Sequence, residues 1–116
     1  MPQRNSIDLG RGSWVWSTGD GRLFFGRPPD VDVEINNIEM FVAALPKEML
    51  LKLCRTKVTV QMTQFWNLKL EALSRIGSLR QLVLLSLAED SAEARDVILN
   101  RIEVIKEWKK NMEGLE

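Results

Sequence analysis

The periodicity of the apolar residues changes once along the chain, at Asn36, and this change limits the folds that the sequence can adopt. Before Asn36, apolar and polar side chains alternate, as they do in half-buried β-strands. After it, apolar residues recur every three or four positions, as they do in amphipathic helices. Strands that precede helices, rather than alternating with them, are typical of the α+β class. The sequence therefore predicts a helix-rich α+β fold.

The stretch SWVWSTGDGRLFFG, residues 13–26, predicts a β-hairpin. Its glycines permit two tight turns, a type II′ turn at Gly19-Asp20 or a type I′ turn at Asp20-Gly21. Either register places the same four apolar residues on one face: Trp14, Trp16, Leu23 and Phe25. We expect this face to cover the helices, since a hairpin alone is only marginally stable in water.

The segment DVDVEI, residues 30–35, predicts a third short strand. Its valines and isoleucine face one way, and its three carboxylates, Asp30, Asp32 and Glu34, face the other. Paired carboxylates are used in acid–base chemistry and in binding divalent metals. In strict alternation with valines, however, they are more typical of the solvated face of a strand, so an enzyme that uses Asp30 or Asp32 is a remote alternative.

About four helices are predicted after the strands. Residues 37–55 form one kinked helix or two short ones, and a helix over most of 56–77 ends at Gly77. The start of this last segment is ambiguous, because Val58, Val60 and Met62 alternate as in a strand. Residues 78–89 are apolar nearly all round and predict the most buried helix, whereas residues 91–113 carry a clean apolar stripe. We assign residues 1–12 to a flexible leader and residues 13–116 to a single domain, with its strands in 13–35 and its helices in 36–113.

The composition argues against most enzyme classes. The chain has no histidine and one cysteine, Cys54, which excludes a structural zinc site and any nucleophile that a histidine activates. We expect no cofactor and no metal. A single cysteine cannot form an intramolecular disulfide, which favours an intracellular location, cytoplasmic or nuclear. Neither a signal peptide nor a membrane-spanning segment is predicted.

Three local features raise the question of binding. The aromatic hairpin, with Arg22 and Arg27, is a candidate interface for a protein, although its apolar face is more typical of a core. The same rings could stack on bases, and four arginines near them could meet phosphates: Arg4, Arg11, Arg22 and Arg27. The sequence TGDGR lacks the lysine and the helix of a phosphate-binding loop. Cys54 lies on an apolar stripe and is interpreted as a buried thiol rather than a reactive one.

The chain carries more apolar faces than one small domain needs, and its 16 basic residues balance its 16 acidic ones. A neutral protein with spare apolar faces tends to associate. A second candidate interface therefore lies on the last helix: Ile98, Ile105 and Trp108. We predict a small non-enzymatic protein-binding domain, an adaptor, inhibitor or regulatory subunit that forms a homo-oligomer. A viral or mobile-element accessory protein would fit. The alternative is a nucleic-acid-binding module built on the hairpin and its arginines.

Overall fold

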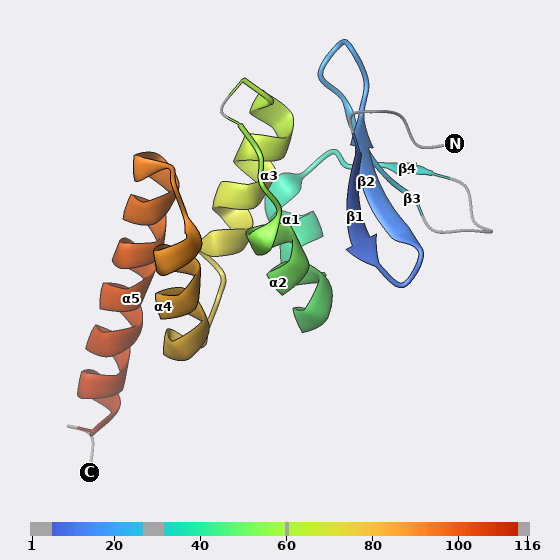
Figure 1. The fold of residues 1–116 in the computed structure, drawn as a ribbon. Helices are drawn as coiled ribbons and strands as arrows, with labels where there is room; N and C mark the ends of the chain where they lie inside the picture. Colours follow the sequence, from blue (N-terminus) through green and yellow to red (C-terminus); the bar gives the residue numbers. More distant parts are fainter. Residues whose placement is uncertain (1–5, 27–31, 60, 114–116) are drawn as a thin grey trace. The chain divides into compact units, whose positions relative to one another are not determined.

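The computed structural model describes residues 6–26, 32–59 and 61–113. It is α+β, with an antiparallel sheet of strand order β1-β2-β3-β4 followed by helices α1 to α5 (Figure 1), and the predicted fold class is confirmed. The contacts divide the chain into two compact units, Met1–Ala72 and Leu73–Glu116. The first, the sheet unit, carries the strands and α1 to α3. The second, the helical hairpin, carries α4 and α5.

The sheet begins earlier than the sequence analysis predicted. Strand β1, Ser6–Gly10, lies inside the segment assigned to a flexible leader and pairs with β2, Ser13–Ser17. The connecting turn puts Gly10, Arg11 and Gly12 at positive φ, a conformation that glycine adopts without strain. The Asp8 carboxylate accepts the Gly10 N–H at 2.8 Å and braces this turn. The signal for the strand was present, because Ile7 and Leu9 alternate with polar residues.

The register of the next hairpin differs from both predicted registers by one residue. In the structure Trp16 pairs with Phe24, and Ser17 with Leu23, where β3 runs from Leu23 to Gly26. The tight two-residue turns fail because the Thr18 hydroxyl accepts the Arg22 N–H at 3.0 Å and so closes a longer loop. A slip of one residue turns every side chain of one strand to the other face. Leu23 and Phe25 therefore do not share a face with Trp14 and Trp16, and that prediction was wrong.

The third predicted strand is present but shorter than expected. Strand β4, Val33–Glu34, pairs with β3 through Phe24–Glu34 and Phe25–Val33. Val33 is exposed although the alternation predicted it on a dry face, because an open groove, rather than packed side chains, lies between Val33 and Met40. Val31 and Asp30 lie outside the described residues.

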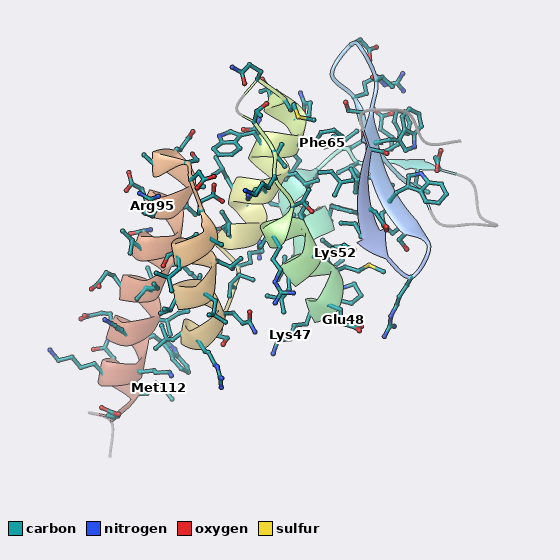
Figure 2. The ribbon with its side chains drawn as sticks, in the orientation of Figure 1. Lys47, Glu48, Lys52, Phe65, Arg95 and Met112 are labelled. Carbon is teal, nitrogen blue, oxygen red and sulfur yellow. The ribbon has the colours of Figure 1, made fainter. Side chains whose placement is uncertain are left out.

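One face of the sheet is buried under helices. It carries Ile7, Leu9, Val15 and Leu23, all at most 5% exposed. Helix α1, Ile38–Ala43, contributes Phe41, whose ring lies 5.4 Å from that of Phe25. Helix α2, Lys47–Arg55, contacts β1. In Figure 2 Phe65, at the start of α3, lies on the side of its helix nearest the sheet.

Three helices, α1, α4 and α5, begin at capping residues that the sequence offers. Asn37 accepts the Met40 N–H at 3.0 Å, and α1 and α2 are two helices rather than one kinked helix. Ser78 caps α4, Leu79–Ala88, and the Ser91 hydroxyl accepts the Ala94 N–H in the first turn of α5, Ala92–Glu113. Helix α3, Thr63–Leu73, ends four residues before Gly77. Gly77 is not at positive φ, so its predicted role as a capping glycine was wrong.

Helices α4 and α5 lie side by side in the helical hairpin (Figure 1). The buried residues of the two helices are Leu82, Leu85, Ala94, Ile98, Ile102 and Ile105. The sequence analysis expected residues 78–89 to be the most buried helix, and this prediction was wrong: Val83, Leu84 and Leu87 are all exposed. None of the helices in the described part of the chain is long and apolar enough to span a membrane.

Candidate interaction surfaces

The outer face of the sheet is the side of the strands opposite α1 and α2, and its residues form two rows. Residues that pair across antiparallel strands point to the same side. The first row is Ser6, Trp16, Phe24 and Glu34, and the second begins Asp8, Trp14 and Gly26. Asp32 ends the second row, since its carboxylate lies above the Cα of Gly26. The outer face thus has aromatic rings in its middle and carboxylates at its rim.

Trp16 is held within this face by two contacts. Its ring stacks on Phe24 with centroids 4.6 Å apart and planes 14° apart. Its indole Nε1–H donates to Asp32 Oδ2 at 3.0 Å. An indole that satisfies its N–H in this way loses little by leaving water. Trp14 and Trp16 are half-buried, and the contacts of Trp16 are made inside the sheet rather than with the helices as predicted.

Arg22 lies over the same aromatic group. Its guanidinium carbon is 5.1 Å from the Phe24 ring centroid, which is cation–π distance. It also donates from Nε and Nη2 to the two Glu34 oxygens at 3.2 and 3.0 Å. This bidentate pairing lowers the pKa of Glu34 and raises the pKa of Arg22. The face therefore already holds one guanidinium between a ring and a carboxylate.

Gly26 leaves space for the side chains of Asp32 and Trp14, because it has no side chain of its own. A Cβ at position 26 would lie 2.9 Å from the Trp14 indole nitrogen and would clash with the Asp32 carboxylate. Real Cβ atoms do not approach heavy atoms so closely. The absence of a side chain at residue 26 thus lets Asp32 come close to both tryptophans.

An apolar groove of about 340 Å³ lies on the other side of β4. Its walls are mostly carbon: Phe25, Val33, Ile35, Met40 and Phe41, with Glu34, Asn36 and Asn37 at its margin. Val33 and Met40 are 61% and 69% exposed. The sequence analysis missed Met40 and Phe41, because the groove exists only where α1 meets the edge of the sheet.

The residues predicted for the first interface fall into three places. Trp14 and Trp16 belong to the outer face, and Arg22 lies beside it. Leu23 and Phe25 belong to the face under the helices. Arg27 lies outside the described residues. Phe24, which was not singled out, has the place that Phe25 was expected to take.

The helical hairpin presents a second surface. Of the second predicted interface, Ile98 and Ile105 are buried inside the hairpin, and only Trp108 is exposed, at 60%. In place of the predicted interface, the helical hairpin has two exposed apolar ridges. The ridge on α4 consists of Val83, Leu84 and Leu87, and the ridge on α5 consists of Val104, Trp108 and Met112. Residues four apart lie on one side of a helix, so each ridge is continuous. In Figure 2 Met112 lies near the end of α5.

The remaining candidates give no chemistry. Among the described residues no three His, Cys, Asp or Glu side chains come together as metal ligands would. Burial raises the pKa of the Cys54 thiol to about 12, which makes it an unreactive buried thiol. A cavity of about 380 Å³ lies between the β2–β3 turn, with Gly19 and Gly21, and residues 61–65, and no lysine or arginine among the described residues lines it. The one cation of the TGDGR segment, Arg22, is paired with Glu34 and does not line this cavity.

The chain matches no known protein family, no curated protein and no solved structure.

Proposed function

We propose that this chain is a small non-enzymatic protein-binding domain that associates with a second copy of itself and acts as an adaptor, inhibitor or regulatory subunit. The observation that carries the proposal is the exposed apolar surface of the helical hairpin. Leu87 is 80% exposed, and Val83 and Leu84 lie beside it on α4. Contiguous apolar surface of this kind marks interaction sites, because its exposure to water is unfavourable.

The formal charge supports association between copies. With 16 acidic and 16 basic residues, two copies of the chain have no net repulsion to overcome. The single cysteine, buried in α2, supports an intracellular location for the complex.

Nucleic acid is the weaker alternative on the described surface. Bases stack on exposed aromatic rings, but the backbone also requires positive charge around them. Asp8, Asp32 and Glu34 border the aromatic rings of the outer face, and Arg22 is already paired with Glu34. Within the described residues, the rim of this face would repel phosphate.

Sedimentation velocity at micromolar concentration tests the proposal. We expect the wild-type chain to form a dimer or a larger species, and the double variant Leu84→Gln, Leu87→Gln to sediment as a monomer with unchanged helix content. Because the association is apolar, it should persist at high salt. The matched control, Val33→Thr with Met40→Gln, removes exposed apolar surface from the sheet unit and should leave the dimer intact. A monomeric wild-type chain would contradict the proposal.

A further inference from the structure

Strand β4 is an edge of the sheet, and its outward backbone groups can be identified. The Ile35 N–H donates to the Leu23 carbonyl at 2.8 Å, so these two residues form a hydrogen-bonded pair. In an antiparallel ladder hydrogen-bonded and non-hydrogen-bonded pairs alternate. The pair Phe24–Glu34 is therefore non-hydrogen-bonded, and the N–H and C=O of Glu34 point away from β3. An exposed edge of this kind is a template for another strand.

The two sides of this edge differ in chemistry. On the side of the helices lies the apolar groove, in which Val33 and Met40 are the most exposed residues. Its volume of about 340 Å³ exceeds that of a leucine-sized side chain. On the outer face the same edge presents the Glu34 carboxylate, with Asp32 close by in the sequence and the Phe24 ring directly opposite Glu34. Side chains that alternate along a strand added here would meet these two surfaces in turn.

The charge on the outer side indicates which side chains would fit. Asp8, Asp32 and Glu34 outnumber Arg22 among the described charged residues of the outer face. Arg22 itself shows how a guanidinium is held there, in cation–π contact with Phe24 and bidentate to Glu34. A planar guanidinium suits this combination of ring and carboxylate better than an ammonium group does.

We propose that an extended segment of a partner protein adds a fifth strand along β4, with apolar side chains in the groove and arginines on the outer face beside Glu34 and Asp32. The inference rests on the proposed protein-binding function and specifies its partner: a segment in which arginine and apolar residues alternate. Backbone hydrogen bonds to Glu34 provide affinity, and the two side-chain surfaces provide specificity. The site shares no residue with the exposed apolar ridges of the helical hairpin.

A short capped peptide that alternates arginine and leucine is the probe, and calorimetric titration is the measurement. A second peptide of the same composition, with its arginines and leucines in separate blocks, controls for charge and hydrophobicity. A third peptide replaces arginine with lysine. We expect the alternating arginine peptide to bind most tightly and the blocked peptide to bind at least tenfold more weakly, since it cannot present one chemistry to each face.

Methylation of single peptide nitrogens tests strand addition directly. An N-methyl group removes a donor and obstructs pairing, so it should abolish binding only at positions whose N–H faces β4. The sensitive positions should alternate along the peptide, because backbone groups point to opposite sides in turn. No other mode of binding predicts this alternation.

Variants of the protein assign the two side-chain surfaces. Glu34→Gln should weaken binding about fivefold, the upper value for an exposed ion pair. Met40→Gln should also weaken binding, because it replaces an apolar side chain that lines the groove with a polar one. The matched control is Glu39→Gln, because Glu39 is an exposed carboxylate next to Met40 on α1 but does not line the groove. Arg22→Gln removes the guanidinium that contacts Phe24 and Glu34, so it should leave both free for an arginine of the peptide and strengthen binding. Arg80→Gln removes an equal charge from α4 and is the matched control, which should strengthen binding less.

Four results would overturn the inference: no binding of the alternating peptide, equal binding of the blocked peptide, methylation effects that do not alternate, or a single-stranded oligonucleotide that competes for the same residues. These results are distinguishable from failure of the proposed function. Self-association depends on Leu84 and Leu87, and its loss in the double variant would stand whether or not the peptide binds to β4.

Discussion

The sheet unit and the helical hairpin treat their apolar surface in opposite ways. The sheet unit covers one face of its strands with helices, and its other face carries aromatic rings, of which Trp16 has its indole N–H paired. The Trp16 indole donates to Asp32, and Arg22 is held between Phe24 and Glu34. The helical hairpin has only two helices, so each can bury one side against its neighbour. Its other sides remain apolar and exposed at Leu87 and Trp108.

This difference shows that an aromatic side chain and an apolar ridge indicate different kinds of surface. On the outer face of the sheet, rings and carboxylates form a patterned surface that can select a partner by charge and geometry. On the helical hairpin, aliphatic side chains form a surface that favours association through area alone. The hydrophobic effect is non-directional, whereas hydrogen bonds and cation–π contacts require defined positions.

Replacing single tryptophans with alanine should separate the two regions most clearly. Trp66→Ala removes a buried ring of α3 and should lower the free energy of unfolding by about 3–5 kcal/mol. Trp16→Ala removes a half-buried stack and one hydrogen bond and should cost about 1–2 kcal/mol. Trp108→Ala, on the exposed ridge of α5, should cost less than about 0.5 kcal/mol. Urea unfolding at low protein concentration measures all three. A cost for Trp16 equal to that for Trp66 would mean that the outer face is a second core.

Two leucines of α4 provide the sharpest test within the helical hairpin. Leu82 is fully buried and Leu84 is exposed, although they are only two residues apart. Leu82→Ala should cost about 2–5 kcal/mol, whereas Leu84→Ala should change stability by less than about 0.5 kcal/mol. Circular dichroism during thermal unfolding gives both values. Equal losses would show that the ridge of α4 is covered in the monomer.

The same substitution at two glycines should have opposite effects in the two units. Gly26→Ala forces a Cβ against Trp14 and Asp32 and should destabilise the sheet unit by about 1–3 kcal/mol. Gly77→Ala has open space and no positive φ, and it should be neutral or stabilise the chain by about 0.4–1 kcal/mol, because it reduces the freedom of the unfolded state. Chemical denaturation of both variants is the measurement. If Gly26→Ala left the free energy of unfolding unchanged, the Asp32 carboxylate could not lie above residue 26.

A pH-dependent effect is expected in the sheet unit at alkaline pH, because Cys54 is the single cysteine of the chain. Burial raises the pKa of its thiol from 9.0 to about 12. Above pH 9 the unfolded chain loses this proton while the folded chain keeps it, so the stability that the thiol contributes falls as the pH rises toward 12. Cys54→Ala should flatten the decrease in stability between these pH values. An unchanged slope in the variant would assign the alkaline loss to the lysines.

The sequence alone determined most of the strands and helices, because period and capping are local properties. The change of period at Asn36 gave the α+β class, and Asn37, Ser78 and Ser91 fixed the starts of their helices. The absence of histidine, a property of the composition alone, limited the possible chemistry. The strand Ser6–Gly10 was also readable, from the alternation of Ile7 and Leu9.

Only the tertiary structure decided which face each side chain occupies. The register of the β2–β3 hairpin depends on the hydrogen bond from Arg22 to Thr18, and a shift of one residue exchanges Phe24 with Phe25 between the outer face and the core. The groove at β4 requires α1 and the sheet edge to meet, and the exposure of Leu87 depends on which side of α4 packs against α5. Periodicity shows that a helix or strand has an apolar side, but burial depends on what packs against that side, and distant parts of the chain supply it.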